Sequence, residues 1–115
     1  MKIIKYPEQI DLAELQAMAT KMFDSLVKAV VDIETHKVIL DLEVHSDGEQ
    51  ELLQQGAKQV NLWGINLHPK QTGDELVEFD SMINLRPSQG NRSRSVDDAN
   101  TRKQIRDIIK QIIKQ

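Results

Sequence analysis

Alternating apolar and polar residues predict a β-hairpin in the first half of the chain. Every second residue is apolar in the segments 27–33 and 38–44, as in strands that bury one face. We expect the chain to turn at residues 35–36, which pairs Val27 with Val44 and puts all eight apolar residues on one face. The opposite face is expected to be partly solvated, because charged residues recur along it.

A second hairpin is predicted later in the sequence. Residues 60–67 and 76–85 again alternate between apolar and polar side chains. The connection between them contains Pro69 and Gly73, two residue types that interrupt regular structure. Residues 3–4 form a further short apolar stretch, so we expect an N-terminal strand in addition to the two hairpins.

Helical periodicity marks further segments. The first helix is predicted to begin at Asp11, which has the capping-box spacing to Glu14. Its apolar stripe comprises Leu12, Leu15, Met18, Met22 and Leu26. A short helix is expected at residues 48–55, between a capping box that starts at Ser46 and the helix-terminating Gly56.

The last helix has the strongest periodic pattern. Asp97 or Asp98 is expected to cap its N-terminus. Isoleucines recur with the three- and four-residue spacing of one helical face, at positions 105, 108, 109, 112 and 113. This stripe predicts a helix that packs either on the sheet or on a partner.

The predicted order of elements is β-α-β-β-α-β-β-α. Hairpins, not crossover helices, dominate the connections between strands, so we expect an α+β fold with a mainly antiparallel sheet covered by helices. A chain of 115 residues has the length of one domain with one core, and residues 1–115 are therefore expected to form a single domain.

Composition and charge narrow the classes of function. The chain has no cysteine, which excludes a thiolate nucleophile, a disulfide framework and a sulfur-ligated zinc site. No apolar run approaches the ~20 residues that span a bilayer, and Pro7 interrupts the N-terminus before a signal-peptide core, so we expect a cytoplasmic protein without a membrane partner.

The net charge of −3 is unevenly distributed along the chain. Residues 1–85 hold 7 lysines and arginines against 15 acidic residues, a net charge of −8, whereas residues 86–115 hold 8 against 3, a net charge of +5. Such polarity suits either the attraction of a polyanion or the docking of the C-terminal helix on the acidic remainder.

The loop from Arg86 to Arg94 is the strongest candidate for a binding site. Guanidinium groups suit phosphate and carboxylate oxygens, flexible loop residues permit unusual backbone angles, and a helix N-terminus with free N–H groups follows. The candidate ligand-binding residues are Arg86, Gly90, Asn91, Arg92 and Arg94. A phosphate-bearing ligand, a nucleotide or RNA, fits these groups; alternatively, the arginines form ion pairs within the fold.

A second candidate is a polar cluster on the second hairpin and at the end of the first. Its members are Asn66, Asp80, Asn84 and His45. A carboxylate beside amides suits either a general base with substrate-orienting groups or a hydrogen-bond network that anchors the arginine loop. The neighbours Glu43 and Asp47 allow an oxygen-and-imidazole metal site at His45, but the histidine spacing of metal motifs is missing, so we predict no metal and no cofactor.

Three functions are compatible with these residues. The first is a binding module for a phosphate-bearing ligand. The second is a phosphodiester-cleaving enzyme that uses the same loop, with Asp80 or His45 as general base. The third is a structural protein without a small-molecule ligand, which forms a homodimer through the isoleucine stripe of the C-terminal helix.

Three segments resemble a family of small prokaryotic domains of unknown function. They are residues 27–34 (VKAVVDIE), 62–67 (LWGINL) and 78–94 (EFDSMINLRPSQGNRSR), and the likeness extends over nearly the whole chain. The resemblance implies a prokaryotic cytoplasmic protein. It brings no substrate, cofactor or catalytic residue with it.

Overall fold

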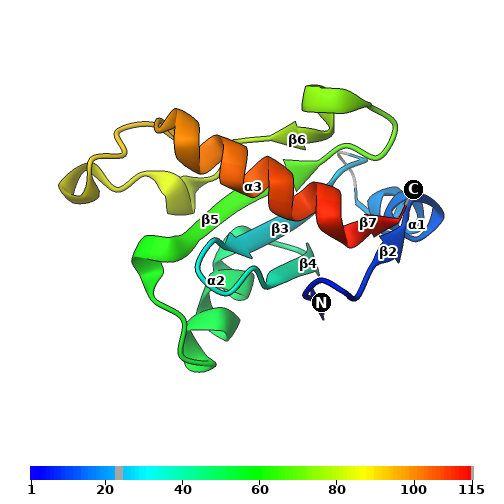
Figure 1. Ribbon diagram of the computed structural model, residues 1–115, viewed down its shortest axis with the longest axis horizontal. Helices are drawn as coiled ribbons and strands as arrows, with labels where there is room; N and C mark the ends of the chain where they lie inside the picture. Colours follow the sequence, from blue (N-terminus) through cyan, green and yellow to red (C-terminus); the bar gives the residue numbers. More distant parts are fainter. Residues whose placement is uncertain (23–24, 115) are drawn as a thin grey trace.

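The predicted antiparallel sheet is present in the computed structural model, which describes residues 1–22 and 25–114 (Figure 1). The sheet has five strands in the order β1-β4-β3-β5-β6, and every neighbouring pair is antiparallel. Its strands are β1 (Lys2–Ile4), β3 (Val27–Asp32), β4 (Val38–Leu42), β5 (Leu62–Leu67) and β6 (Val77–Glu78). The α+β class and the approximate order of elements are therefore confirmed.

Helices cover both faces of this sheet. The helices are α1 (Leu12–Thr20), α2 (His45–Gln54) and α3 (Ala99–Ile112). Figure 1 shows α3 lying across one face, where residues of α1 and α3 share a large apolar core with the strands. On the other face, Leu52 of α2 packs with Val30, Ile39, Leu42 and Leu62 in a smaller core. The sheet is therefore apolar on both sides.

The first helix begins as predicted but is shorter than its stripe. Asp11 is the N-cap, and its side chain accepts a hydrogen bond from the backbone N–H of Glu14 at 2.8 Å. The helix ends at Thr20, so Leu26 reaches the core from the segment that comes after it. Leu12, the first residue of the helix, is 41% exposed, so its place in the buried stripe was wrong, whereas Leu15 is fully buried.

The register of the first hairpin differs from the prediction by two residues. Val31 pairs with Val38 and Ala29 with Leu40, and the ladder shifts between Lys28 and Ala29. Such a bulge bends and twists a strand, and here the backbone of Asp41 has a φ of 63°. Beyond this irregularity, Leu42 belongs to the second core and Val44 is 48% exposed. The expectation of eight apolar residues on one face was therefore wrong.

The opposite face of this hairpin is also drier than predicted. Val30 and Ile39 are fully buried beneath α2. This helix begins at His45, three residues earlier than expected, and Ser46 lies in its first turn instead of capping it. The predicted end is confirmed, since Gly56 adopts a φ of 99° just beyond the last turn.

The second hairpin is paired over a short length only. The ladder between β5 and β6 joins Asn66 with Glu78 and Leu67 with Val77. The expected strand over residues 76–85 does not continue, because the chain turns into the 3₁₀ helix η3 (Met82–Asn84). Its N-cap is Ser81, whose hydroxyl accepts a hydrogen bond from the N–H of Ile83 at 3.3 Å.

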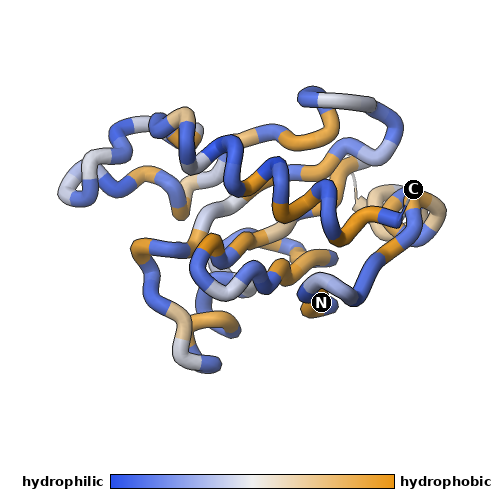
Figure 2. The backbone as a smooth tube through the Cα atoms, viewed as in Figure 1, coloured by the Kyte–Doolittle hydropathy of each residue, from blue (hydrophilic) through white to orange (hydrophobic). Residues whose placement is uncertain are grey.

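The last helix packs on the sheet of its own chain. Asp98 is the N-cap and accepts a hydrogen bond from the N–H of Thr101. The isoleucines of the predicted stripe are all buried, at positions 105, 108, 109, 112 and 113. Apolar and polar positions alternate along α3 (Figure 2). The last of these isoleucines belongs to β7 (Ile113–Lys114), which pairs in parallel with β2 (Ile10–Asp11), a contact that the sequence did not reveal. The isoleucine stripe is thus buried in the core of its own chain.

Gly48 allows α2 to approach the sheet closely, and its substitution tests this packing. A Cβ atom at this position would lie 2.5 Å from Leu42 Cδ1 and 3.0 Å from Ile39 Cγ2. Alanine gains about 1 kcal/mol in helix propensity, but overpacking costs about 1–3 kcal/mol. The net of these two terms is a loss of about 0–2 kcal/mol, and we expect Gly48→Ala to lower the free energy of unfolding by about 1 kcal/mol in urea denaturation. The exposed Gln50→Ala should change it by less than about 0.5 kcal/mol, and an equal effect of both would contradict this account.

Candidate functional site

The segment after β6 completes the free edge of β5 with side chains instead of a strand. Asn84 is fully buried, and its Oδ1 accepts a hydrogen bond from the N–H of Gly64 at 2.8 Å. Its Nδ2 donates to the carbonyl of Gly64 at 2.9 Å and to that of Arg94, also at 2.9 Å. One amide side chain therefore satisfies both backbone groups of a β5 residue, as an adjacent strand would.

Arg86 anchors the same segment one step further along β5. Its guanidinium donates to the carbonyl oxygens of Gln59 and Leu62, and it stacks over the ring of Trp63 at 4.1 Å. The residue is 7% exposed, and burial lowers the pKa of its guanidinium. The guanidinium of Arg86 therefore makes its contacts within the fold, whereas the sequence predicted it to be a ligand-binding group.

Gly90 and Asn91 shape the loop that the sequence singled out. The backbone of Gly90 has a φ of 85°, and reciprocal hydrogen bonds of 2.9 and 3.1 Å join Arg86 and Asn91 on either side of the turn. The buried Asn91 side chain donates to the carbonyl oxygens of Asn84, Ser93 and Ser95. Both residues therefore set the path of the loop.

Two carboxylates of the protein itself, those of Asp97 and Asp98, occupy the start of the last helix. Asp98 caps it, and Asp97 accepts hydrogen bonds from the N–H of Arg92 and the hydroxyl of Ser93. Those hydrogen bonds, the one from Ser93 foremost, lower the pKa of Asp97. The side chain of Arg92 itself is exposed. The expected anion site at this helix N-terminus is therefore filled from within the fold.

Arg94 points to a different place. Its Nε donates to Oδ1 of Asp80 at 2.7 Å, with both side chains about half exposed. The two residues line a cavity of about 440 Å³, together with His45 and Asn66. One arginine of the predicted loop and most of the predicted polar cluster thus converge, while Asn84 lies behind them in the framework.

The N-terminus of α2 opens onto the same cavity. Val44 is its N-cap and offers no side-chain acceptor to the first turn, so backbone N–H groups remain available beside His45 and Ser46. Lys28 of β3 contributes a second cation to the wall. The sequence predicted Ser46 as a cap, and no local signal placed Ser46 or Lys28 at a cavity.

Hydrogen bonds orient the polar groups of the wall. His45 Nε2 lies 2.8 Å from the carbonyl of Ile65, which can only accept, so Nε2 carries the proton in the neutral ring. Asn66 Nδ2 donates to Glu78 Oε1 at 3.0 Å and to the carbonyl of Asp80 at 3.2 Å. Its Oδ1 is buried and finds no donor within residues 1–22 and 25–114. The Asn66 amide therefore serves the fold through its two donated hydrogen bonds, and its Oδ1 is not accessible from the cavity.

The electrostatics of the cavity combine both signs of charge. The hydrogen bond from Asn66 and, after it, the one from His68 at 3.1 Å lower the pKa of Glu78, whose carboxylate lines the wall with that of Asp80. Arg94 and Lys28 bring two cations. In the described part of the chain, no group of three histidine or acidic side chains is arranged to hold a metal ion. This holds also for His45 with its neighbours Glu43 and Asp47.

Asn84 tests whether the loop depends on this side-chain edge. Asn84→Asp preserves shape but removes the Nδ2 donor, leaving the carbonyl oxygens of Gly64 and Arg94 opposite a carboxylate. We expect the free energy of unfolding at pH 7 to fall by about 3 kcal/mol in urea denaturation. The same exchange at the exposed Asn100, in the first turn of α3, should cost less than about 0.5 kcal/mol. A tolerated Asn84→Asp would show that the edge is dispensable.

His45 should make stability depend on pH. Burial lowers the pKa of its imidazole below the ordinary value of 6.5, so below that pH the unfolded chain binds a proton that the folded chain does not. The wild type is thus expected to lose stability as pH falls from 7.5 to 5.5, with a contribution of at most about 1.4 kcal/mol per pH unit, reduced by partial exposure. Urea denaturation of His45→Gln should show a shallower pH dependence, and an unchanged slope would refute the assignment.

Similarity to known proteins is found at the level of a family model that covers nearly the whole chain. No helix in the described residues is long and apolar enough to cross a membrane. Neither the curated proteins nor the solved structures contain a match to the chain. A family model, described as Protein of unknown function (DUF5674), matches residues 2–112, a range that includes the β5 edge, the arginine loop and both faces of the sheet. The chain therefore belongs to the DUF5674 family.

Proposed function

We propose that this protein is a small binding module that holds a phosphate-bearing ligand, a nucleotide or RNA, in the cavity beside α2. The observation that carries the proposal is the position of Arg94, which comes from the arginine loop and lines the same cavity as the N-terminus of α2. A guanidinium and free backbone N–H groups are the usual partners of phosphate oxygens. We place this module in the prokaryotic cytoplasm, in keeping with its resemblance to a family of small prokaryotic domains.

The half-exposed ion pair of Arg94 suits an exchange of partners. Asp80 holds the guanidinium at 2.7 Å in the free protein, and side chains of this pair are 54% and 45% exposed. Exposed ion pairs contribute little to stability, so a doubly charged phosphate can compete for the arginine at low cost. Lys28 adds a second positive charge to the same wall.

The remaining wall favours a ligand larger than phosphate. Val44 and Met82 are 48% and 61% exposed and lie at the cavity, where they offer apolar contact to a base. Carboxylates of Glu78 and Asp80 accept hydrogen bonds from amino or hydroxyl groups. A nucleotide carries all three kinds of group.

A second candidate function is phosphodiester cleavage in the same cavity. His45 and Asp80 both line it, and burial keeps the imidazole of His45 neutral at pH 7 by lowering its pKa, as a general base requires. Turnover of bis(p-nitrophenyl) phosphate, lost in Asp80→Asn or His45→Gln while the fold persists, would establish an enzyme. Saturable binding without turnover supports the module.

Ligand binding is expected to depend on Arg94 and not on overall charge. Isothermal titration calorimetry at low salt with AMP, ATP and a short oligoribonucleotide should give saturable binding to the wild type. Arg94→Gln should weaken it by about tenfold or more, because it removes a charge-assisted hydrogen bond.

Arg92→Gln is the matched control for this experiment. It makes the same change of charge in the same loop, but Arg92 is exposed and does not line the cavity. Its binding should equal that of the wild type. Equal losses in the two variants, or no binding of any of these probes to the wild type, would reject the proposed site.

A further inference from the structure

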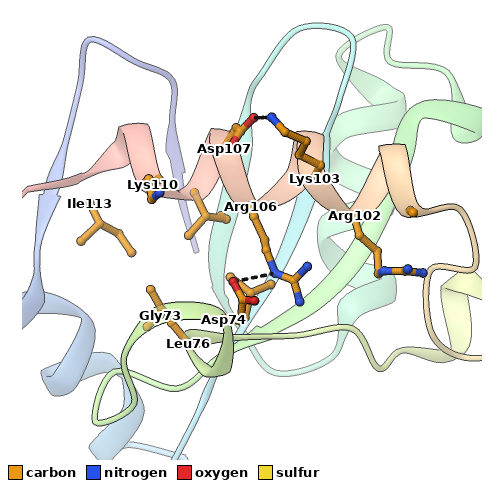
Figure 3. Close-up of a pocket in the computed structure, with 12 residues that line it drawn as sticks. Gly73, Asp74, Leu76, Arg102, Lys103, Arg106, Asp107, Lys110 and Ile113 are labelled. Carbon is orange, nitrogen blue, oxygen red and sulfur yellow. Dashed lines mark hydrogen bonds and ion pairs between the residues drawn. The ribbon is translucent and has the colours of Figure 1, made fainter.

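A second concave surface lies on the other face of the sheet, between α3 and the segment that leads into β6 (Figure 3). It encloses about 590 Å³, within the range of small-molecule sites. One wall is the 3₁₀ helix η2 (Gly73–Leu76), and the other is the outer side of α3. None of its lining residues belongs to the cavity beside α2, so a ligand in this groove would be independent of the proposed function.

The floor of this groove is apolar. Its residues are Leu76, Val77, Ile109 and Ile113, of which Ile109 is fully buried. Val77 and Ile113 are 7% and 6% exposed, so part of each side chain remains accessible at the base of the groove. A ligand with a hydrocarbon body would cover this surface and remove it from water.

The rim is predominantly basic. Its lining includes four cations (Arg102, Lys103, Arg106 and Lys110) and two carboxylates (Asp74 and Asp107), a net charge of +2. Residues 102, 106 and 110 are spaced four apart on α3, so their side chains form one row with steps of about 6 Å. Part of the excess of basic residues in segment 86–115 thus forms a row along one groove.

The cations at the two ends of this row differ in how far the fold uses them. Arg102 donates to the carbonyl oxygens of Val96 and Asp97 at 2.7 and 3.1 Å and therefore serves the start of α3. Lys103 pairs with Asp107 at 2.9 Å in an exposed contact. Lys110, in contrast, has no ion pair with any residue that the structure describes.

Arg106 occupies the centre of the row and is only loosely held. Its guanidinium stacks over Phe79 at 4.9 Å, and its Nε is 3.7 Å from Asp74, too far for a hydrogen bond (Figure 3). The side chain of Asp74 is 87% exposed, so this carboxylate approaches the arginine from solvent. A carboxylate already near Arg106 shows which kind of group the position attracts.

We propose that this groove binds an organic anion with an apolar body. Its carboxylate or phosphate head displaces Asp74 and contacts Arg106 and Lys110, while its hydrocarbon part lies on the floor formed with Leu76 and Val77. Head and body are both needed, because the cations are exposed to water and the floor carries no polar partner for a charged group.

Titration calorimetry with four probes tests this site. Octanoate and octyl phosphate represent the two kinds of head, whereas inorganic phosphate lacks the body and octylamine carries the opposite charge. We expect saturable binding of octanoate, octyl phosphate or both. Inorganic phosphate and octylamine should bind at least about tenfold more weakly. Lys110→Gln and Arg106→Gln should each weaken binding by about fivefold or more, and Asp74→Asn should strengthen it, since a competing carboxylate is removed.

Controls separate this groove from general charge and from the other cavity. Lys114→Gln changes the same charge just beyond α3 without lining the groove, and Arg94→Gln alters only the cavity beside α2, so both should bind as the wild type does. Lys110 makes no ion pair within the described chain, so its variant is expected to fold even if Arg106→Gln is unstable. Absence of binding, or an equal loss in Lys110→Gln and Lys114→Gln, would overturn the proposal.

Discussion

The pairing of the Asn84 amide with the backbone of Gly64 is the interaction on which the functional half of this molecule depends. β6 leaves most of the β5 edge uncovered, and unpaired backbone groups in a buried position cost about 1–3 kcal/mol each. Asn84 satisfies one such residue, and Arg86 reaches the carbonyl of Leu62 beyond it. Gly64 is required here, since a Cβ atom would lie 2.6 Å from the side chain of Ser81. Side chains, and not a further strand, thus attach an irregular segment to the edge of the sheet. A regular strand in this place would leave no irregular loop there that could vary.

This attachment separates the arginines of the chain into two groups. Arg86 and Arg102 use their guanidinium groups on backbone carbonyl oxygens and so hold the loop and the start of α3 in place. Arg94 and Arg106 are partly exposed, and each faces a carboxylate that is itself exposed to solvent. The difference is one of desolvation, because a buried guanidinium must find acceptors within the fold, whereas an exposed one can exchange them.

The two surfaces proposed for ligands lie on opposite faces of one sheet. The cavity beside α2 mixes carboxylates with cations and has apolar residues at its mouth, whereas the groove beside α3 is basic at the rim and apolar at the floor. β6 and the segment after it contribute to both, since Val77 lines the groove while Glu78 and Asp80 line the cavity. The alternation of side chains in an extended segment is what lets neighbouring residues serve different faces.

The sequence by itself determined the features that depend on neighbours along the chain: the helix cap at Asp11, a cap at either Asp97 or Asp98, the isoleucine face of the last helix and the antiparallel hairpins. It could not determine the register of the first hairpin, because a slip of two residues preserves the alternation on which the prediction rested. It also gave no sign of the irregularity beyond which Leu42 joins the second core. Nor could it reveal that α2 begins at His45, that Gly48 lets this helix approach the sheet closely, or which arginine is buried. Those outcomes were decided by the tertiary structure, since they depend on contacts between residues far apart in sequence, and the energies of such contacts leave no local pattern.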